Sequence, residues 1–354
     1  MISMANLARY GRICFDATLV LLIVATSANR AAAQGFDRVH NRNGTKFGKI
    51  TKMNVLGFTL TRGGVETKIP VEEIVSITFA GEPEDLAPAR SAATAGRFED
   101  ALAKLNRIDR NDIDRVEIAQ EIDFLVTLCK AELSLSGQRS LAQAEQEVTR
   151  FLSKNGKSFR VPAAIELLGN VLLANRDYDG ARVQYAKLGK ARAPYFKARS
   201  ALLTGRSLHA EGKDEAAVAA FDQALQAAEG NVVAESQKLE ATLHRAVSQS
   251  ALGDVQLSTD TVNEIISRAD REETQLLAQA YIALGDCYLQ AEKNKAALDA
   301  FLHVDLLFNS SAAEHARALH ELAQLWEAKG QSDRSRDAQQ RLIDKYPGSR
   351  WAKQ

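Results

Sequence analysis

The spacing of apolar and polar residues changes twice along the chain and divides it into three parts. A short apolar run, ATLVLLIVATSA, occupies positions 17–28. From Gly35 to Ala80 apolar and polar residues alternate at the period of a β-strand, with many Val, Ile, Thr and Phe residues. After the breaker segment GEPEDLAPAR, nearly every window has the 3.6-residue period of an amphipathic helix. The pattern predicts a mostly α protein, with a small β unit at 35–80 and a helical part at 81–354.

The first 33 residues have the three parts of a secretory signal. Arg9 and Arg12 give a basic start before the apolar run, and the small-residue pattern Ala31-x-Ala33 follows it. The run of 12 apolar residues is short for a membrane span, which needs about 20. We therefore expect cleavage near Ala33 and export to a bacterial periplasm or the exterior, with no transmembrane segment left. An uncleaved anchor is the alternative.

The β unit is expected to hold four or five short strands with one buried face. Asn43-Gly44 and Gly63-Gly64 supply turns between the strands. The order of strands and turns resembles that of Sm-like and SH3-like small barrels. A unit of about 46 residues is marginal by itself, so we expect it to dock on the helices that follow.

One pattern recurs in the helical part and pairs a small residue on one helix with another on the next. It is clearest in YIALGDCY at positions 281–288, which is followed by Ala297 and Phe301. A glycine within a helix costs about 1 kcal/mol relative to alanine, so its recurrence indicates close helix packing. The expected helix-crossing pairs are Gly169 with Ala181, Gly205 with Ala217, and Gly285 with Ala297.

This pattern resembles the tetratricopeptide repeat, whose usual period is about 34 residues. The units here are longer, and the resemblance is specific in three of them and looser in four. It implies a right-handed α-solenoid of about seven helical hairpins. A generic helical solenoid is the alternative.

The resemblance also implies a binding groove whose wall comes from the first helix of each unit. Arg199 and Arg206 are seven positions apart on one helical face and suit an acidic peptide, although ordinary solvated arginines remain the alternative. Asn170 matches a position of the family's clamp for acidic chaperone tails, but Glu166 stands where that clamp has a lysine. The groove candidates are Glu166, Asn170, Arg199, Leu202, Arg206, His209, Ile282 and Asp286.

The sequence offers no recognisable catalytic or metal-binding motif. His315 and His320 are five apart, and His320-Glu321 lacks the second histidine of a zinc-protease helix. There is no nucleophile elbow, phosphate loop or dinucleotide fingerprint. We therefore expect no enzymatic activity, no cofactor and no metal. Cys129 and Cys287 lie in apolar helical surroundings and are interpreted as buried small hydrophobes rather than a disulfide.

Charge argues against a general nucleic-acid binder, because 45 Lys and Arg balance 45 Asp and Glu. The β unit alone is basic, but its basic residues are not interleaved with aromatics for base stacking. The sequence thus predicts an exported adaptor or scaffold that binds a protein or peptide in its groove. The alternatives are RNA or ligand binding through the β unit, and an accessory subunit of an envelope enzyme complex.

Overall fold

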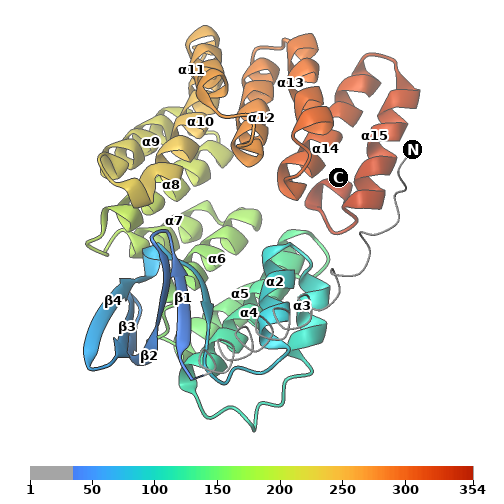
Figure 1. The fold of residues 1–354 in the computed structure, drawn as a ribbon. Coiled ribbons are helices and arrows are strands. Elements are labelled where there is room, and N and C mark those ends of the chain that lie inside the picture. Colours follow the sequence, from blue (N-terminus) through green and yellow to red (C-terminus); the bar gives the residue numbers. More distant parts are fainter. Residues whose placement is uncertain (1–34, 354) are drawn as a thin grey trace, which may run out of the picture.

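A computed structural model describes residues 35–353, in which a small sheet precedes a curved array of helices (Figure 1). The expected signal at 1–33 lies outside the described residues. Within 35–353, no helix combines the length and the apolar character needed to cross a membrane. The mostly α architecture and the small N-terminal β unit predicted from the sequence are confirmed.

The β unit is a five-stranded antiparallel sheet of order β4-β3-β2-β1-β5. Gly63 and Gly64 have φ of 58° and 81°, as the two-residue turn between β3 and β4 requires. The 3₁₀ turn η1 (Val71–Glu73) joins β4 to β5. The strands are β1 (Asp37–Asn41), β2 (Gly44–Asn54), β3 (Gly57–Arg62), β4 (Val65–Pro70) and β5 (Ile74–Thr78).

Within residues 35–353 the helices form seven successive hairpins, and the repeats predicted about seven. Helix boundaries follow local signals, such as the prolines in the first turns of α6 and α8. Gly212, with φ of 80°, closes α8. The pairs are α2 (Leu86–Thr94) with α3 (Phe98–Leu105), α4 (Val116–Leu135) with α5 (Leu141–Lys154), α6 (Val161–Ala174) with α7 (Tyr178–Leu188), α8 (Pro194–Ala210) with α9 (Asp214–Ala228), α10 (Glu235–Ala251) with α11 (Val255–Arg268), α12 (Thr274–Gln290) with α13 (Asn294–Leu307), and α14 (Ala312–Ala328) with α15 (Ser332–Lys345).

The first helices of the hairpins form the inner layer of the array, and the second helices form the outer layer (Figure 1). Along the inner layer α8 contacts α10, α10 contacts α12, and α12 contacts α14. After α15 the chain turns into η3 (Arg350–Lys353), which packs against α14 and α15. Gly348 in this turn touches Gln138 after α4, since a Cβ there would lie 2.1 Å from the Gln138 amide nitrogen. The array therefore curves until its C-terminal end meets its second hairpin.

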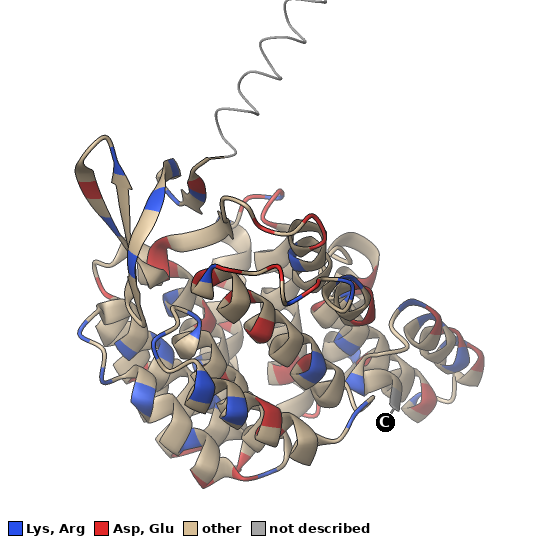
Figure 2. Cartoon of the chain, turned by 90° about the horizontal axis from the view of Figure 1, so that it is seen from below, with Lys and Arg blue, Asp and Glu red and all other residues tan. Residues whose placement is uncertain are grey.

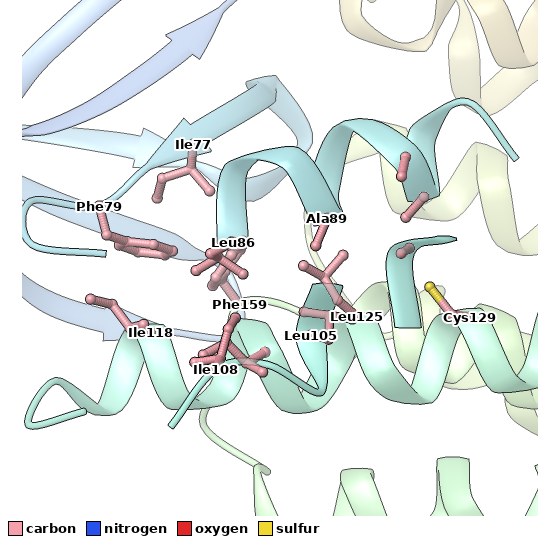
Figure 3. Close-up of a cluster of buried hydrophobic side chains, with 14 of the residues drawn as sticks. Ile77, Phe79, Leu86, Ala89, Leu105, Ile108, Ile118, Leu125, Cys129 and Phe159 are labelled. Atoms are coloured by element: carbon pink, nitrogen blue, oxygen red, sulfur yellow. The ribbon is translucent and has the colours of Figure 1, made fainter. Parts of the chain in front are cut away.

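The sheet and the first helices share one hydrophobic core (Figure 3). Ile77 and Phe79 from the sheet meet Leu86 of α2 and Ile118 of α4 in this cluster. Phe159, in the loop before α6, packs against Phe58 of β3 in a tilted arrangement, with ring centroids 4.5 Å apart. The β unit thus docks on the helices, as its small size predicted. Its hydrophobic core continues into the helical part that follows residue 80.

In three hairpins a glycine of the first helix lies directly under an aromatic ring of the second. A Cβ at Gly285 would lie 2.5 Å from Phe301 Cε1, and the other two pairs are Gly169 under Tyr185 at 2.2 Å and Gly205 under Phe221 at 2.5 Å. Real Cβ contacts are never this short, so a side chain at these positions would displace the ring. The expected small partners Ala181, Ala217 and Ala297 are fully buried, but the residues that meet the glycines are the aromatic ones.

The two cysteines of the described chain are buried and unbonded, as the sequence predicted. Burial, followed by the charge of Glu132, raises the pKa of Cys129 to about 12. Burial and Asp286 raise the pKa of Cys287 to about 12 in the same way. Both thiols therefore stay protonated near neutral pH and act as small apolar groups.

Candidate interaction surface

The inner helices α6, α8, α10, α12 and α14 carry most of the residues expected in the groove. Their charged side chains are largely paired with one another, and Figure 2 shows acidic and basic residues interspersed over the helices. A hollow lies between α10 and α12 on this layer. It is lined by Ser236, Leu239, Glu240, Glu272, Glu273, Thr274, Gln275, Leu276 and Gln279.

Arg199 links three successive inner helices. From α8 its guanidinium donates to Glu166 of α6 and, over 2.9 Å, to Glu240 of α10. Burial lowers the pKa of Arg199, but the charges and hydrogen bonds of these two carboxylates raise it more, so it stays above its ordinary value. No close backbone packing joins α6 to α8 as it joins α8 to α10. The Arg199 side chain therefore bridges three helices, and its guanidinium is already occupied by two carboxylates of the protein.

Arg206 is the more available of the two arginines. Its guanidinium lies 3.5 Å from Glu240, its one ion-pair partner among the described residues, and 34% of the side chain is exposed. A pair at this distance with this exposure is weakly held. Another carboxylate can compete with Glu240 for Arg206 at small cost.

Asn170 follows Gly169 on α6 as Arg206 follows Gly205 on α8, and its side chain is held in a defined orientation. The hydroxyl of Tyr185 donates to its side-chain carbonyl over 2.9 Å. Burial raises the pKa of Tyr185, so the hydroxyl keeps its proton and remains a donor. Since the carbonyl is engaged, the two N–H groups of the Asn170 amide are oriented as donors.

His209 contacts an acid and a hydroxyl, but the arrangement is not a charge relay. Asp214 Oδ1 lies 2.6 Å and Ser248 Oγ lies 3.0 Å from the same ring nitrogen, Nδ1. A relay needs the acid and the nucleophile on opposite nitrogens of the imidazole. Ser248 is also fully buried. The contacts fix His209 at the end of α8 and provide no nucleophile.

His244 on α10 lies near several basic groups, and its Nε2 is 3.9 Å from a carboxylate oxygen of Glu240. Burial, followed by the charges of Arg206, His209 and Arg317, lowers its pKa well below the ordinary value. Its ring stacks on Phe221, with centroids 5.8 Å apart and planes 16° from parallel. At neutral pH the side chain is therefore a neutral, packed imidazole.

Asp286 is also paired. Its carboxylate accepts a hydrogen bond from Arg317 of α14 over 2.6 Å. Burial raises the pKa of Asp286 by more than Arg317 lowers it. Asp286 therefore ties α12 to α14 along the inner layer.

Two of the expected groove residues do not reach the surface. Leu202 is 0% exposed and Ile282 is 7% exposed, so these two groove candidates are core residues that a ligand cannot contact. Both stand three positions before the glycine of their helix, where α8 packs on α10 and α12 packs on α14. Glu166 holds the same position on α6, where it accepts a hydrogen bond from Arg199 of α8, and it remains partly exposed.

Sequence reasoning missed Glu240 and Arg317, which complete the wall. The signal was present, because each stands six positions before the small residue of its helix, as Arg199 does before Gly205. The repeat signature is weak around Glu240, which hid the correspondence. Trp351 of η3 was also missed, and its ring lies 5.6 Å from the Arg317 guanidinium at the end of the wall.

The described residues contain no group of three or more His, Cys, Asp or Glu side chains placed to hold a metal ion. The contacts found along the inner helices are hydrogen bonds and ion pairs between partly buried side chains.

Comparison with solved structures identifies the fold. A Rap protein complexed with competence and sporulation factor is 14% identical over 75% of this chain and 76% of its own, with a TM-score of 0.52. The helices form an array of tetratricopeptide-like hairpins. A tetratricopeptide repeat protein from Parabacteroides merdae is 15% identical over 76% of this chain and 96% of its own, with a TM-score of 0.48. No family model and no curated protein matches the chain.

Proposed function

We propose that the protein is an adaptor that holds a peptide or protein segment against the inner layer of its tetratricopeptide-repeat array. The observation that carries the proposal is the pair of available polar groups on neighbouring inner helices. Asn170 presents oriented amide donors, and Arg206 has only a weak partner. The Rap protein of similar fold, with a TM-score of 0.52, is itself complexed with competence and sporulation factor.

The two groups suit an extended segment that carries an acidic residue. An asparagine amide with its carbonyl engaged donates to a backbone carbonyl, which any peptide supplies. Arg206 can exchange Glu240 for a carboxylate of the segment, and a charge-assisted hydrogen bond is worth about 1.5–3 kcal/mol. Arg199 is excluded from this role because Glu166 and Glu240 already occupy it.

The test is capture of the partner followed by affinity measurement on single variants. We expect Asn170→Ala and Arg206→Ala each to weaken binding roughly ten-fold, about 1.4 kcal/mol. Arg268→Ala is the matched control, because Arg268 lies on the outer helix α11 and is 77% exposed. Unchanged affinity in both wall variants would place the binding surface elsewhere.

We further propose that this adaptor works in the cell envelope after removal of residues 1–33. The support is the basic, apolar and small-residue pattern that ends at Ala33. Mass spectrometry of protein isolated from its native cell should find a chain that begins near Gln34. A membrane-bound chain that retains Met1 would contradict the proposal.

A further inference from the structure

The outer edge of the sheet is open along β4. Within residues 35–353, β4 pairs with β3 alone, and it lies at the margin of the molecule away from the helices (Figure 1). Its first four residues, Val65 to Lys68, are all exposed, and Val65 is 68% exposed although it is apolar. The pairing with β3 has no bulge, and the one proline is the last residue of the strand. Its exposed part therefore has neither a bulge nor a proline to block pairing, and the charges of Glu66 and Lys68 decide which strand it can accept.

The register of the hairpin determines which backbone groups face the open side. A two-residue turn makes Arg62 and Val65, the pair that closes it, a hydrogen-bonded pair, and hydrogen-bonded and non-bonded pairs then alternate. The N–H and C=O groups of Glu66 and Lys68 thus point away from β3. Pro70 occupies the next outward position, where its missing N–H costs no bond within the sheet.

The sequence of this edge is complementary to itself. Glu66 and Lys68 flank Thr67 symmetrically, and their side chains lie on the same face of the sheet. If two such strands run antiparallel about a two-fold axis at Thr67, Glu66 of each lies opposite Lys68 of the other. Opposite charges directly across a strand pair stabilise the pairing.

We propose that β4 pairs with β4 of a second copy of this chain, antiparallel about a two-fold axis at Thr67. The outward N–H and C=O groups of Glu66 and Lys68 then meet as hydrogen-bonded pairs, which occur twice by symmetry. Val65 of each chain lies opposite Ile69 of the other on the core-facing side. The second strand thereby shields part of the exposed Val65 side chain.

The dimer is expected to be weak and dependent on concentration. A short strand pair buries less than the 1,200 Å² or so typical of stable complexes, so we expect a Kd on the order of 10–100 µM. In the single chain Glu66 lies 3.3 Å from Lys52, and these two side chains are 51% and 69% exposed. Such an exposed pair contributes little, so Lys68 of the second copy can compete with Lys52 for Glu66.

Charge exchange at the two positions tests the pairing by sedimentation over a concentration series. Glu66→Lys and Lys68→Glu should each weaken self-association at least ten-fold, because like charges then face each other. An equimolar mixture of these two variants restores both opposite-charge pairs and should associate like the wild type. The double variant Glu66→Lys/Lys68→Glu should also dimerise by itself. Lys49→Glu, a matched charge change on β2 away from the edge, should have no effect.

Monomeric wild-type protein up to about 1 mM would overturn the proposal, since a Kd above that value corresponds to less than about 4 kcal/mol. A dimer that survives both single variants, or one that the mixture fails to restore, would equally exclude this pairing. Thermal unfolding of each variant shows whether the core that the sheet shares with the first helices is intact, so that loss of association is not confused with unfolding.

Discussion

Arg199 Nη1 lies 2.9 Å from Glu240 Oε2, and this contact joins α8 to α10 on the inner layer of the array. The same guanidinium also holds Glu166 of α6. A residue that the sequence suggested as a ligand contact is therefore a bridge between three helices. Its removal should change the stability of the array before it changes the binding of any partner.

We predict that Arg199→Ala lowers the free energy of unfolding by about 1–3 kcal/mol, because two partly buried carboxylates lose their common partner. Arg206→Ala is the control, because this arginine is 34% exposed and has one ion pair at 3.5 Å. It should cost less than about 1 kcal/mol. Urea unfolding of both variants measures the difference, and equal effects would show that Arg199 does not brace the helices.

Replacement of Gly285 should disturb its hairpin through the ring of Phe301. A Cβ at this position would lie 2.5 Å from the ring, so Gly285→Leu should destabilise the protein by about 1–3 kcal/mol through overpacking. Lys293→Leu, at an exposed position between α12 and α13, should change the melting temperature little. Gly285→Ala combined with Phe301→Leu should be more stable than Gly285→Ala alone, because the smaller side chain makes room. The same melting temperature for Gly285→Leu and Lys293→Leu would refute the close contact.

Because of Glu121, the free energy of unfolding should depend on pH. It is fully buried, and its carboxylate accepts hydrogen bonds from Arg90 of α2 and Arg160 before α6. Burial raises the pKa of Glu121, but the two guanidiniums lower it more, so the pKa in the folded state is below its ordinary value. Because the folded pKa is depressed, this contribution is complete above the unfolded pKa of about 4.3 and is lost as pH falls through the folded pKa.

We therefore expect Glu121→Gln to lose about 3 kcal/mol of unfolding free energy at pH 7, where the wild type keeps both ion pairs. The difference from the wild type should shrink below about pH 4. Chemical unfolding from pH 3 to pH 7 measures it. A difference that stays constant over this range would show that the ionised carboxylate is not what stabilises the site.

The buried thiols should resist alkylation in the folded protein. With pKa values of about 12, Cys129 and Cys287 supply almost no thiolate at pH 8. Iodoacetamide should modify neither until urea is added, after which two thiols react in a chain without residues 1–33. A chain that retains Cys14 has three thiols. The number of labelled thiols, counted by mass spectrometry, therefore also shows whether residues 1–33 have been removed. Rapid labelling of Cys287 in native protein would contradict its burial.

The repeat pattern was sufficient to predict the hairpins, because helix pairing is a local property of the chain. Gly169, Gly205 and Gly285 each mark a first helix, and the second helix follows within one repeat. The strand alternation and the Gly63-Gly64 turn likewise predicted β3 and β4. These signals succeed because the residues that pack together lie close in sequence.

The surface of the inner layer was decided by contacts between repeats, which no local pattern reports. Leu202 and Glu166 occupy equivalent positions of their helices, yet Leu202 is buried in a cluster with Phe221 of α9 and Ala241 of α10, whereas Glu166 is partly exposed. The partners of Arg199 lie 33 and 41 residues away. The sequence by itself determined the hairpins, their number and the buried cysteines. Only the tertiary structure decided which charged residues neutralise one another, because that depends on how far each hairpin is rotated against the next.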